Sequence, residues 1–230
     1  MKTTHGEEAD IRTSSAIQVM SLVFIGIIII ASTTNPIATG TDEGERAPAL
    51  EGKMYDGGGW TEFDLDSYWD YNWDSSDVTG VWMLLEFMDT DCPYCVQSAS
   101  EMSANSEDFS SRENAWDGAL VNFVASATEL SIEGHESSRD EIVAFRDKTP
   151  NSGQKCAGSA CESRPGDAHS FPYIDDLDQD NMKEWNVGGT PSYYLIQPDG
   201  IIAWSSSEHP GEEPRDAILA FCAKENFEGA

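Results

Sequence analysis

Apolar residues gather in short runs along the middle and the C-terminal part of the chain, and turn-forming residues bound these runs. We expect strands at Val81 to Met88, Leu120 to Ser126, Ser192 to Gln197 and Ile201 to Ser205, because short apolar runs between turn signals are typical of buried strands. A Pro-Asp-Gly turn at residues 198–200 separates the last two runs. We therefore expect these two strands to form a hairpin.

Helical patterns lie between and after these strands. Val96, Ala99 and Met102 recur on one face of a helix, and the sequence SSRDEIVAFRD at 137–147 opens with capping residues. A third helical pattern, PRDAILAFCAKE at 214–225, follows the hairpin. Strands that alternate with helices and end in a hairpin predict an α/β sandwich with a central mixed β-sheet.

The most apolar stretch lies near the N-terminus, where residues 17–31 read IQVMSLVFIGIIIIA. With its flanks it extends over residues 16–34, close to the length of a membrane span. Lys2 and Arg12 are offset by three nearby carboxylates, and no Ala-x-Ala cleavage site follows. We therefore expect a single-pass membrane anchor in preference to a removed signal peptide, and a buried core helix is the third alternative.

This segment divides the chain into four expected parts. Residues 1–15 form a cytoplasmic tail, 16–34 the anchor or signal segment, 35–46 a polar, flexible linker, and 47–230 one folded domain. The domain is then expected at the cell membrane on the extracytoplasmic side, or secreted if the segment is cleaved.

Charge excludes one class of partner. The chain has 13 Lys and Arg against 42 Asp and Glu, a formal net charge of −29. Such a field repels nucleic acid, which proteins bind through cationic side chains. The carboxylates are spread along the chain in twos and threes, which indicates a strongly solvated, salt-adapted surface.

The candidate chemistry lies in EFMDTDCPYCVQ at residues 86–97. Cys92 and Cys95 stand where a predicted strand gives way to a predicted helix, with Pro93 in the first helical turn. Free backbone N–H groups and the helix dipole favour a thiolate there, so the pKa of Cys92 should fall from ~8.5 towards roughly 3.5–7.5. An exposed Cys92 sulfur would then attack a disulfide, and Cys95 would resolve the mixed disulfide.

Two alternatives remain for this cysteine pair, namely a structural disulfide or half of a zinc site completed by Cys156 and Cys161. The four histidines show no ligand spacing, so we expect neither a metal nor a cofactor beyond the redox-active cysteines. Glu86 interrupts an otherwise apolar strand six residues before Cys92. It is either the base that accepts the proton of Cys95 or an edge-strand carboxylate that faces water.

Four segments together resemble the thioredoxin superfamily, and most closely its membrane-tethered TlpA-like thiol-disulfide oxidoreductases. They are APALEG (47–52) with FDLDSYW (63–69), VWMLLEFMDTDCPYC (81–95), SSRDEIVAFRD (137–147) and FPYIDDLDQDNMKEWNVGGTPSYYLIQPDGIIAW (171–204). A C-x-x-C at a strand-to-helix junction, followed about a hundred residues later by Gly-Thr-Pro before a hairpin, is a specific combination.

The resemblance implies a thioredoxin-like three-layer sandwich. It also implies that Glu86 is a buried acid and that Pro191 is a cis-proline facing the dithiol. The residues that would contact substrate are Pro93, Tyr94, Thr190 and Pro191.

The chain departs from the family at two places. Asp89, Thr90 and Asp91 stand where the family usually has a tryptophan, and Lys148 to Ser170 is a longer insertion. The insertion carries Cys156 and Cys161, which we expect to form a structural disulfide in an oxidising compartment; a second redox relay is the alternative. Cys222, in an apolar run, is expected to be a buried free thiol.

These observations predict thiol-disulfide exchange on extracytoplasmic proteins, and the resemblance favours the reductant direction. The expected partners are protein disulfide or dithiol substrates and a membrane redox protein that regenerates the dithiol. A peroxiredoxin-like peroxidase is one alternative, although its Pro-x-x-x-Thr-x-x-Cys pattern is absent, since Thr90 lies two residues before Cys92. A copper-delivery or redox-inert binding module is the other.

Overall fold

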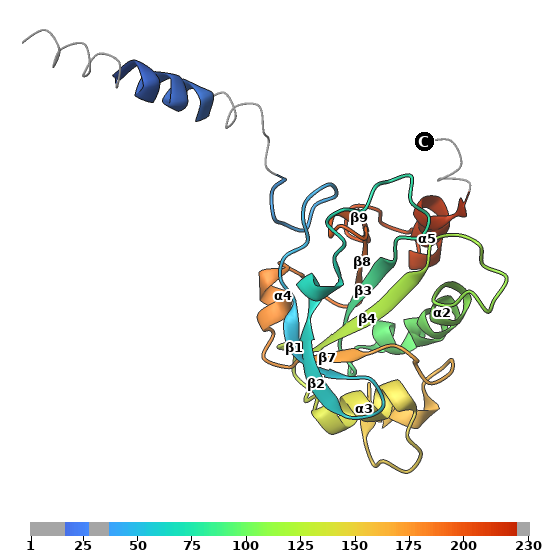
Figure 1. Cartoon of the computed structure of the whole chain (residues 1–230). Helices are drawn as coiled ribbons and strands as arrows, with labels where there is room; N and C mark the ends of the chain where they lie inside the picture. The colour runs from blue at the N-terminus through green and yellow to red at the C-terminus, as the bar shows by residue number, and fades with distance from the viewer. Residues whose placement is uncertain (1–16, 28–36, 225–230) are drawn as a thin grey trace, which may run out of the picture. The chain divides into compact units, whose positions relative to one another are not determined.

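The structure, a computed structural model, describes residues 17–27 and 37–224 of the chain (Figure 1). The chain divides into two compact units, Met1–Ala38 and Thr39–Ala230. The first contains a helix at residues 17–27. Within the described ranges, no helix has the length and apolar character needed to cross a membrane. The expected tail at 1–15 and the ends of the expected anchor, at 16 and 28–34, lie outside these ranges.

A mixed sheet forms the centre of the second unit. The described residues contribute seven strands to it, in the order β2-β1-β7-β4-β3-β8-β9. Strand β3 is parallel to β4, and β4 is parallel to β7, whereas the remaining pairs are antiparallel. The strands are β1 (Glu51–Tyr55), β2 (Trp60–Asp64), β3 (Trp82–Met88), β4 (Val121–Thr128), β7 (Tyr173–Asp176), β8 (Ser192–Ile196) and β9 (Ile202–Ser205).

Helices cover both faces of this sheet (Figure 1). One core cluster joins one face to α2 (Pro93–Phe109), α3 (Arg139–Asp147) and α5 (Pro214–Cys222). The other cluster joins the opposite face to α4 (Asp180–Glu184) and to the 3-10 turn η1 (Leu65–Tyr68). Three layers result, which confirms the expected α/β fold with a central mixed sheet.

Local sequence explains how the main elements form. Every residue of β3 is buried, as expected of a central strand covered on both faces. Helix α3 begins after Ser138, whose side chain accepts a hydrogen bond from the N–H of Glu141 at 3.2 Å. Helix α5 begins with Pro214 in its first turn, preceded by a capping box between Glu213 and Asp216.

The folded unit begins earlier than the expected boundary at Ala47. The backbone N–H of Gly44 donates to the carbonyl of Ile202 at 2.8 Å, and the N–H of Ile202 donates to the carbonyl of Glu45 at 2.9 Å. Residues 44–46 therefore pair with residues at the start of β9, and Thr39 and Gly40 pair with Arg46. The expected flexible linker is corrected over residues 39–46. Polar composition did not reveal this, because the edge strand β9 binds the segment through backbone groups.

The insertion at 148–170 folds into small elements of its own. It contains the hairpin of β5 (Lys155–Cys156) and β6 (Ser159–Ala160), followed by the 3-10 turn η2 (Cys161–Ser163). The Lys148 ammonium donates to the carbonyls of Arg164 and Gly166 at 2.8 and 2.7 Å. These bonds hold the two ends of the insertion together beside α3.

Candidate active site

The topology brings the candidate residues to one edge of the sheet. Strands β3 and β4 are parallel, so the segments that follow them leave at the same edge. Strand β8 is antiparallel to β3, so the residues that precede β8 lie at that edge too. Cys92 follows β3 and Pro191 precedes β8, and the Thr190–Pro191 peptide bond is cis. The dithiol and the Gly-Thr-Pro segment, about a hundred residues apart in sequence, therefore meet.

Cys92 is the N-cap residue of α2, with extended backbone angles and Pro93 directly after it. Its thiol donates a hydrogen bond to the backbone oxygen of Thr190 at 3.3 Å. Hydrogen bonding from the Cys95 thiol lowers the pKa of Cys92 to about 5, with help from the side chain of Thr190 and the backbone N–H groups of Tyr94 and Cys95 and against the effect of burial. Cys92 is thus suited to be the nucleophile.

The expectation that the Cys92 sulfur is exposed is wrong for this structure. Cys92 is only 4% exposed, because the Thr190–Pro191 segment lies against it. Tyr94, in contrast, is 69% exposed beside it. Tyr94, Pro93 and the half-buried Thr190 and Pro191 border the dithiol, where the sequence placed the substrate-binding residues.

Cys95 lies one helical turn further on and has the opposite character. It is 1% exposed, and burial raises its pKa well above the usual value, with the hydrogen bond to Cys92 and the charge of Glu86 adding to the shift. Both sulfurs are free, so the structure holds the reduced dithiol. One thiol is therefore ionised at neutral pH, and the other needs a base before it can attack.

Glu86 lies in the centre of the sheet beneath this pair. Its strand β3 runs between β4 and β8, and the paired residues Tyr173, Ala125, Glu86 and Tyr193 form one row across four strands. Residues paired in this way project from the same face, and this face is the one covered by α2 and α3. Glu86 is 2% exposed, so the alternative of an edge-strand carboxylate in water does not hold.

The surroundings of Glu86 set its protonation. Burial raises its pKa to about 8, against the opposing effects of a hydrogen bond with Tyr193 and the positive charge of Arg164. Arg164 comes from the insertion and is 3% exposed. Its guanidinium donates to the carbonyls of Phe145 at 2.6 Å and Arg146 at 3.2 Å. Nothing in the sequence around Arg164 marks it as a neighbour of Glu86.

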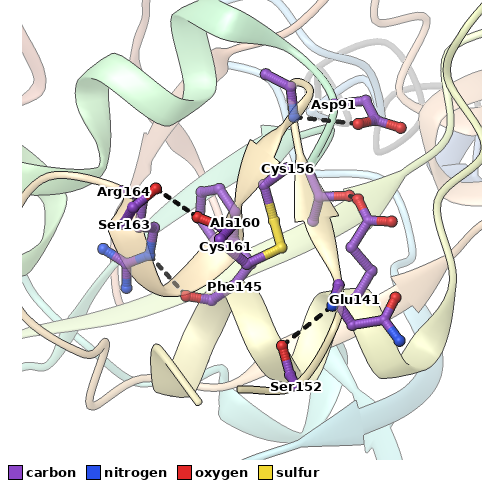
Figure 2. Close-up of a disulfide and its surroundings, with 12 residues drawn as sticks. Asp91, Glu141, Phe145, Ser152, Cys156, Ala160, Cys161, Ser163 and Arg164 are labelled. Carbon is purple, nitrogen blue, oxygen red and sulfur yellow. Dashed lines mark hydrogen bonds between the residues drawn. A yellow bond between two sulfur atoms is a disulfide. The ribbon is translucent and has the colours of Figure 1, made fainter. Parts of the chain in front are cut away.

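The insertion also reaches the turn that precedes Cys92. A disulfide joins Cys156 of β5 to Cys161, the first residue of η2 after the β5–β6 hairpin, with a Cα–Cα distance of 4.8 Å (Figure 2). The backbone N–H of Ala157, in the same hairpin, donates to Asp91 at 3.1 Å.

The zinc alternative required thiolates from both pairs, and the described residues contain no group of three or more candidate metal ligands. Cys222 is buried and free.

The residues ahead of Cys92 bind to a loop that the sequence did not single out. Asp89 is fully buried and bonds to His135, Ser137 and the N–H of Leu130, all in the loop between β4 and α3. Thr90 donates to Glu141 of α3, whose pKa burial raises to about 7. Asp89 and Thr90, with the partners named above, thus stand at the position ahead of the dithiol where the resemblance led us to expect a tryptophan.

A family model described as the AhpC/TSA family matches residues 44–205. The chain belongs to the AhpC/TSA family. The match contains the dithiol, Glu86 and the cis-proline, and it supports the thioredoxin-like resemblance and an oxidoreductase activity that uses thiol chemistry. No curated protein matches the chain.

Solved structures similar to this AhpC/TSA family member share little sequence with it. A reduced 2-Cys peroxiredoxin of Plasmodium vivax has 15% identity and a TM-score of 0.47, and the match covers 78% of this chain and 93% of that one. The thioredoxin domain of a Bacteroides vulgatus thiol-disulfide oxidoreductase has 15% identity and a TM-score of 0.44, covering 71% and 87%. A secreted Mycobacterium tuberculosis disulfide oxidoreductase homologous to E. coli DsbE has 18% identity and a TM-score of 0.40, covering 70% and 87%.

Proposed function

We propose that this AhpC/TSA family member catalyses thiol-disulfide exchange on extracytoplasmic proteins through Cys92 and Cys95. The observation that carries the proposal is that the pKa values of two cysteines one helical turn apart are shifted in opposite directions. The pKa of Cys92 falls to about 5, whereas that of Cys95 rises well above its usual value. A dithiol that ionises at one sulfur only is suited to attack first with Cys92 and then to resolve with Cys95.

The proposed reaction has two steps. The Cys92 thiolate attacks one sulfur of a substrate disulfide, which forms a mixed disulfide and releases the other substrate sulfur. Cys95 then gives its proton to the ionised form of Glu86, the minor form at neutral pH because the pKa is about 8. The Cys95 thiolate attacks the Cys92 sulfur, which forms the Cys92–Cys95 disulfide and releases the second substrate sulfur. Two electrons pass from the dithiol to the substrate. A membrane redox partner with a dithiol of its own would reduce the enzyme again.

Two features support a location outside the cytoplasm. The Cys156–Cys161 disulfide is of the kind that persists in oxidising compartments. The helix at 17–27 exposes apolar side chains along its length, as a segment destined for lipid does. We therefore propose that residues 16–34 anchor the domain to the cell membrane, unless the segment is cleaved and the domain secreted.

We propose the reductant direction from the resemblance to TlpA-like proteins, and the reduction potential tests it. A lowered pKa of Cys92 stabilises the reduced form, so we expect a potential somewhat above thioredoxin's ~−270 mV. A measured value close to ~−120 mV would reverse the proposed direction.

The family match favours a peroxidase as the second candidate. In that reaction the Cys92 thiolate would attack a peroxide oxygen. The hydroxyl of Thr90 is already bonded to Glu141 and lies within 2.9 Å of the Ser137 hydroxyl, so it is not aimed at a peroxide. Stopped-flow oxidation of the reduced chain by hydrogen peroxide, compared with a protein disulfide, separates the two candidates.

Cysteine variants test the proposed function directly. With a protein disulfide as substrate, Cys92→Ser should abolish reduction, whereas Cys156→Ser should leave it largely intact because that pair does not exchange. Cys222→Ser is the matched control, since Cys222 is a buried free thiol that the proposed reaction does not use. Comparable losses in the Cys92 and Cys156 variants would move the active pair elsewhere.

A further inference from the structure

The turn directly ahead of Cys92 contains a buried carboxylate with four hydrogen-bond partners. Asp89 is fully buried. One of its oxygens accepts from the N–H of Asp91 at 2.8 Å and from the Ser137 hydroxyl at 3.2 Å. The other accepts from the N–H of Leu130 at 2.9 Å and bonds to Nδ1 of His135 at 2.6 Å. A carboxylate bound in this way is firmly placed.

His135 is thereby held in one orientation against the turn that leads into Cys92, close enough for the charge of Cys92 to act on it. A carboxylate accepts hydrogen bonds, so Nδ1 carries a proton and Nε2 is the nitrogen that gains or loses one. The next residue, Glu136, donates its N–H to Asp91 at 3.1 Å. The N–H of Cys92 donates to the carbonyl of Asp89 at 3.0 Å. The loop that carries His135 is therefore fastened across the turn that leads into Cys92.

The imidazole is partly open to solvent, with 14% of its side chain exposed. Burial lowers its pKa, but the hydrogen bond and charge of Asp89 outweigh that effect, and the charges of Asp91 and Cys92 add to it, so the pKa is raised overall. Among the described residues, the charged groups that act on the ring from this turn and from the N-cap of α2 are all negative. Glu141 of α3, bonded to Thr90, adds a further carboxyl to this cluster.

We propose that His135, oriented by Asp89, protonates the substrate sulfur that leaves when Cys92 attacks a disulfide. This inference rests on the proposed function. In the step, a bond forms between the Cys92 sulfur and one substrate sulfur, and the substrate S–S bond breaks. The departing sulfur takes the proton from Nε2 and leaves as a thiol. His135 is then neutral and regains its proton from water.

The acidity of Cys92 explains why such a proton donor is useful. A thiolate of low pKa is the better leaving group in exchange, so a mixed disulfide with an ordinary cysteine tends to expel Cys92 again. The leaving cysteine has a pKa of ~8.5 when free and is the more strongly nucleophilic thiolate. Protonating it as it departs blocks this return reaction. A general acid in such a position contributes typically about 10²–10⁴-fold to rate.

The test compares two small disulfides whose leaving thiols differ in acidity. The full chain carrying Cys95→Ser stops at the mixed disulfide, so that the first step is measured alone. One probe is 5,5′-dithiobis(2-nitrobenzoate), whose aromatic thiol leaves unprotonated. The other is bis(2-hydroxyethyl) disulfide, whose alkyl thiol is much more basic. His135→Gln retains a donor for Asp89 and removes the transferable proton.

The parent for these comparisons is the full chain with Cys95→Ser alone. Relative to it, we expect His135→Gln to slow attack on the alkyl disulfide by about 10²-fold or more and to change attack on the aromatic disulfide by no more than a few-fold. Asp89→Asn removes the negative charge and replaces one of the two acceptor oxygens with an NH2 donor, which weakens the bond that orients the ring, so it should give the same selective loss. His209→Gln is the control, because His209 pairs with Glu43 in another part of the domain. The parent rate with the alkyl disulfide should also fall as the pH rises through the raised pKa of His135, and the variant should lack that fall.

Equal losses with both disulfides would assign His135 a structural role and overturn the inference. An unchanged rate with the alkyl disulfide would overturn it too. Both results leave the proposed function standing, provided that the parent chain attacks both probes. If the parent attacks neither probe, the proposed function itself fails, and the inference about His135 fails with it.

Discussion

Replacing Glu86 with glutamine keeps the size of the side chain and a polar oxygen for Tyr193, but it removes the group that accepts the proton of Cys95. Attack by Cys92 should survive this change, because that sulfur is already ionised at neutral pH. Release of the substrate should slow by about 10²-fold, the usual loss when general-base help is removed. The two steps therefore separate in the variant.

The same substitution has a consequence for stability that follows from the structure. The pKa of Glu86 is raised from 4.5 to about 8, mainly by burial. The folded chain therefore keeps a proton that the unfolded chain releases above pH ~4.5. The stabilisation is fully present below that pH and is lost as the pH rises through about 8. The shift corresponds to roughly 5 kcal/mol of unfolding free energy, which the parent chain loses as the pH rises. The glutamine variant has no ionisable group at this position and does not lose it.

Two assays read these effects. Rapid mixing of the reduced chain with a model disulfide should show the mixed disulfide accumulating in the Glu86→Gln variant only. Denaturant unfolding of the oxidised proteins should show similar stabilities near pH 4 and a variant more stable by several kcal/mol near pH 8.5. Burial, the main cause of the shift, does not depend on the redox state of the dithiol. Glu62→Gln, at an exposed position of β2, is the control.

Two results would refute this reasoning. If attack and release slow equally, or if neither changes, Glu86 does not serve as the base for Cys95. If the variant and the parent have the same unfolding free energy at every pH, the carboxylate is not held protonated by its surroundings.

Three further experiments have defined expected outcomes. Cys95→Ser should leave Cys92 able to attack, so covalent complexes with substrate proteins should accumulate on non-reducing gels; their absence would count against a mixed disulfide. Alkylation of the reduced chain by iodoacetamide should rise with pH around a midpoint near the Cys92 pKa of about 5, and a midpoint near ~8.5 would contradict the lowered pKa. Trp185→Ala should cost about 3–5 kcal/mol in unfolding free energy, because this fully buried ring packs on Phe87 and Tyr194. The exposed Tyr68→Ala should cost much less.

The strands that the sequence predicted are those with long apolar runs. The predicted positions of β3, β4, β8 and β9 agree with the structure to within one or two residues at each end, since both faces of the sheet are covered there. Strands β1, β2 and β7 were not predicted. They read EGKMY, WTEFD and YIDD. Strands β1 and β2 mix polar and apolar residues because they lie partly in contact with solvent, and the buried β7 has only four residues and ends in two aspartates. Backbone pairing holds such strands, and it leaves no hydrophobic pattern.

The residues of the dithiol site were predictable where a local motif or a family resemblance marks them. Cys92, Cys95 and Pro191 lie in recognisable motifs, and Glu86 interrupts an apolar run. His135 lies in a polar loop without a motif, and so it was missed. Its contact with Asp89 joins two segments that follow neighbouring parallel strands, which only the paired sheet brings together.

By itself, the sequence determined that a dithiol stands at the start of a helix behind a buried strand, since helix caps and apolar runs are local properties. The tertiary structure decided how that dithiol is tuned. Thr190 reaches Cys92 across the sheet edge, burial beneath α2 raises the pKa of Glu86, and Asp89 orients His135. Desolvation and hydrogen bonding depend on which distant segments close over a group, and chain order does not specify that.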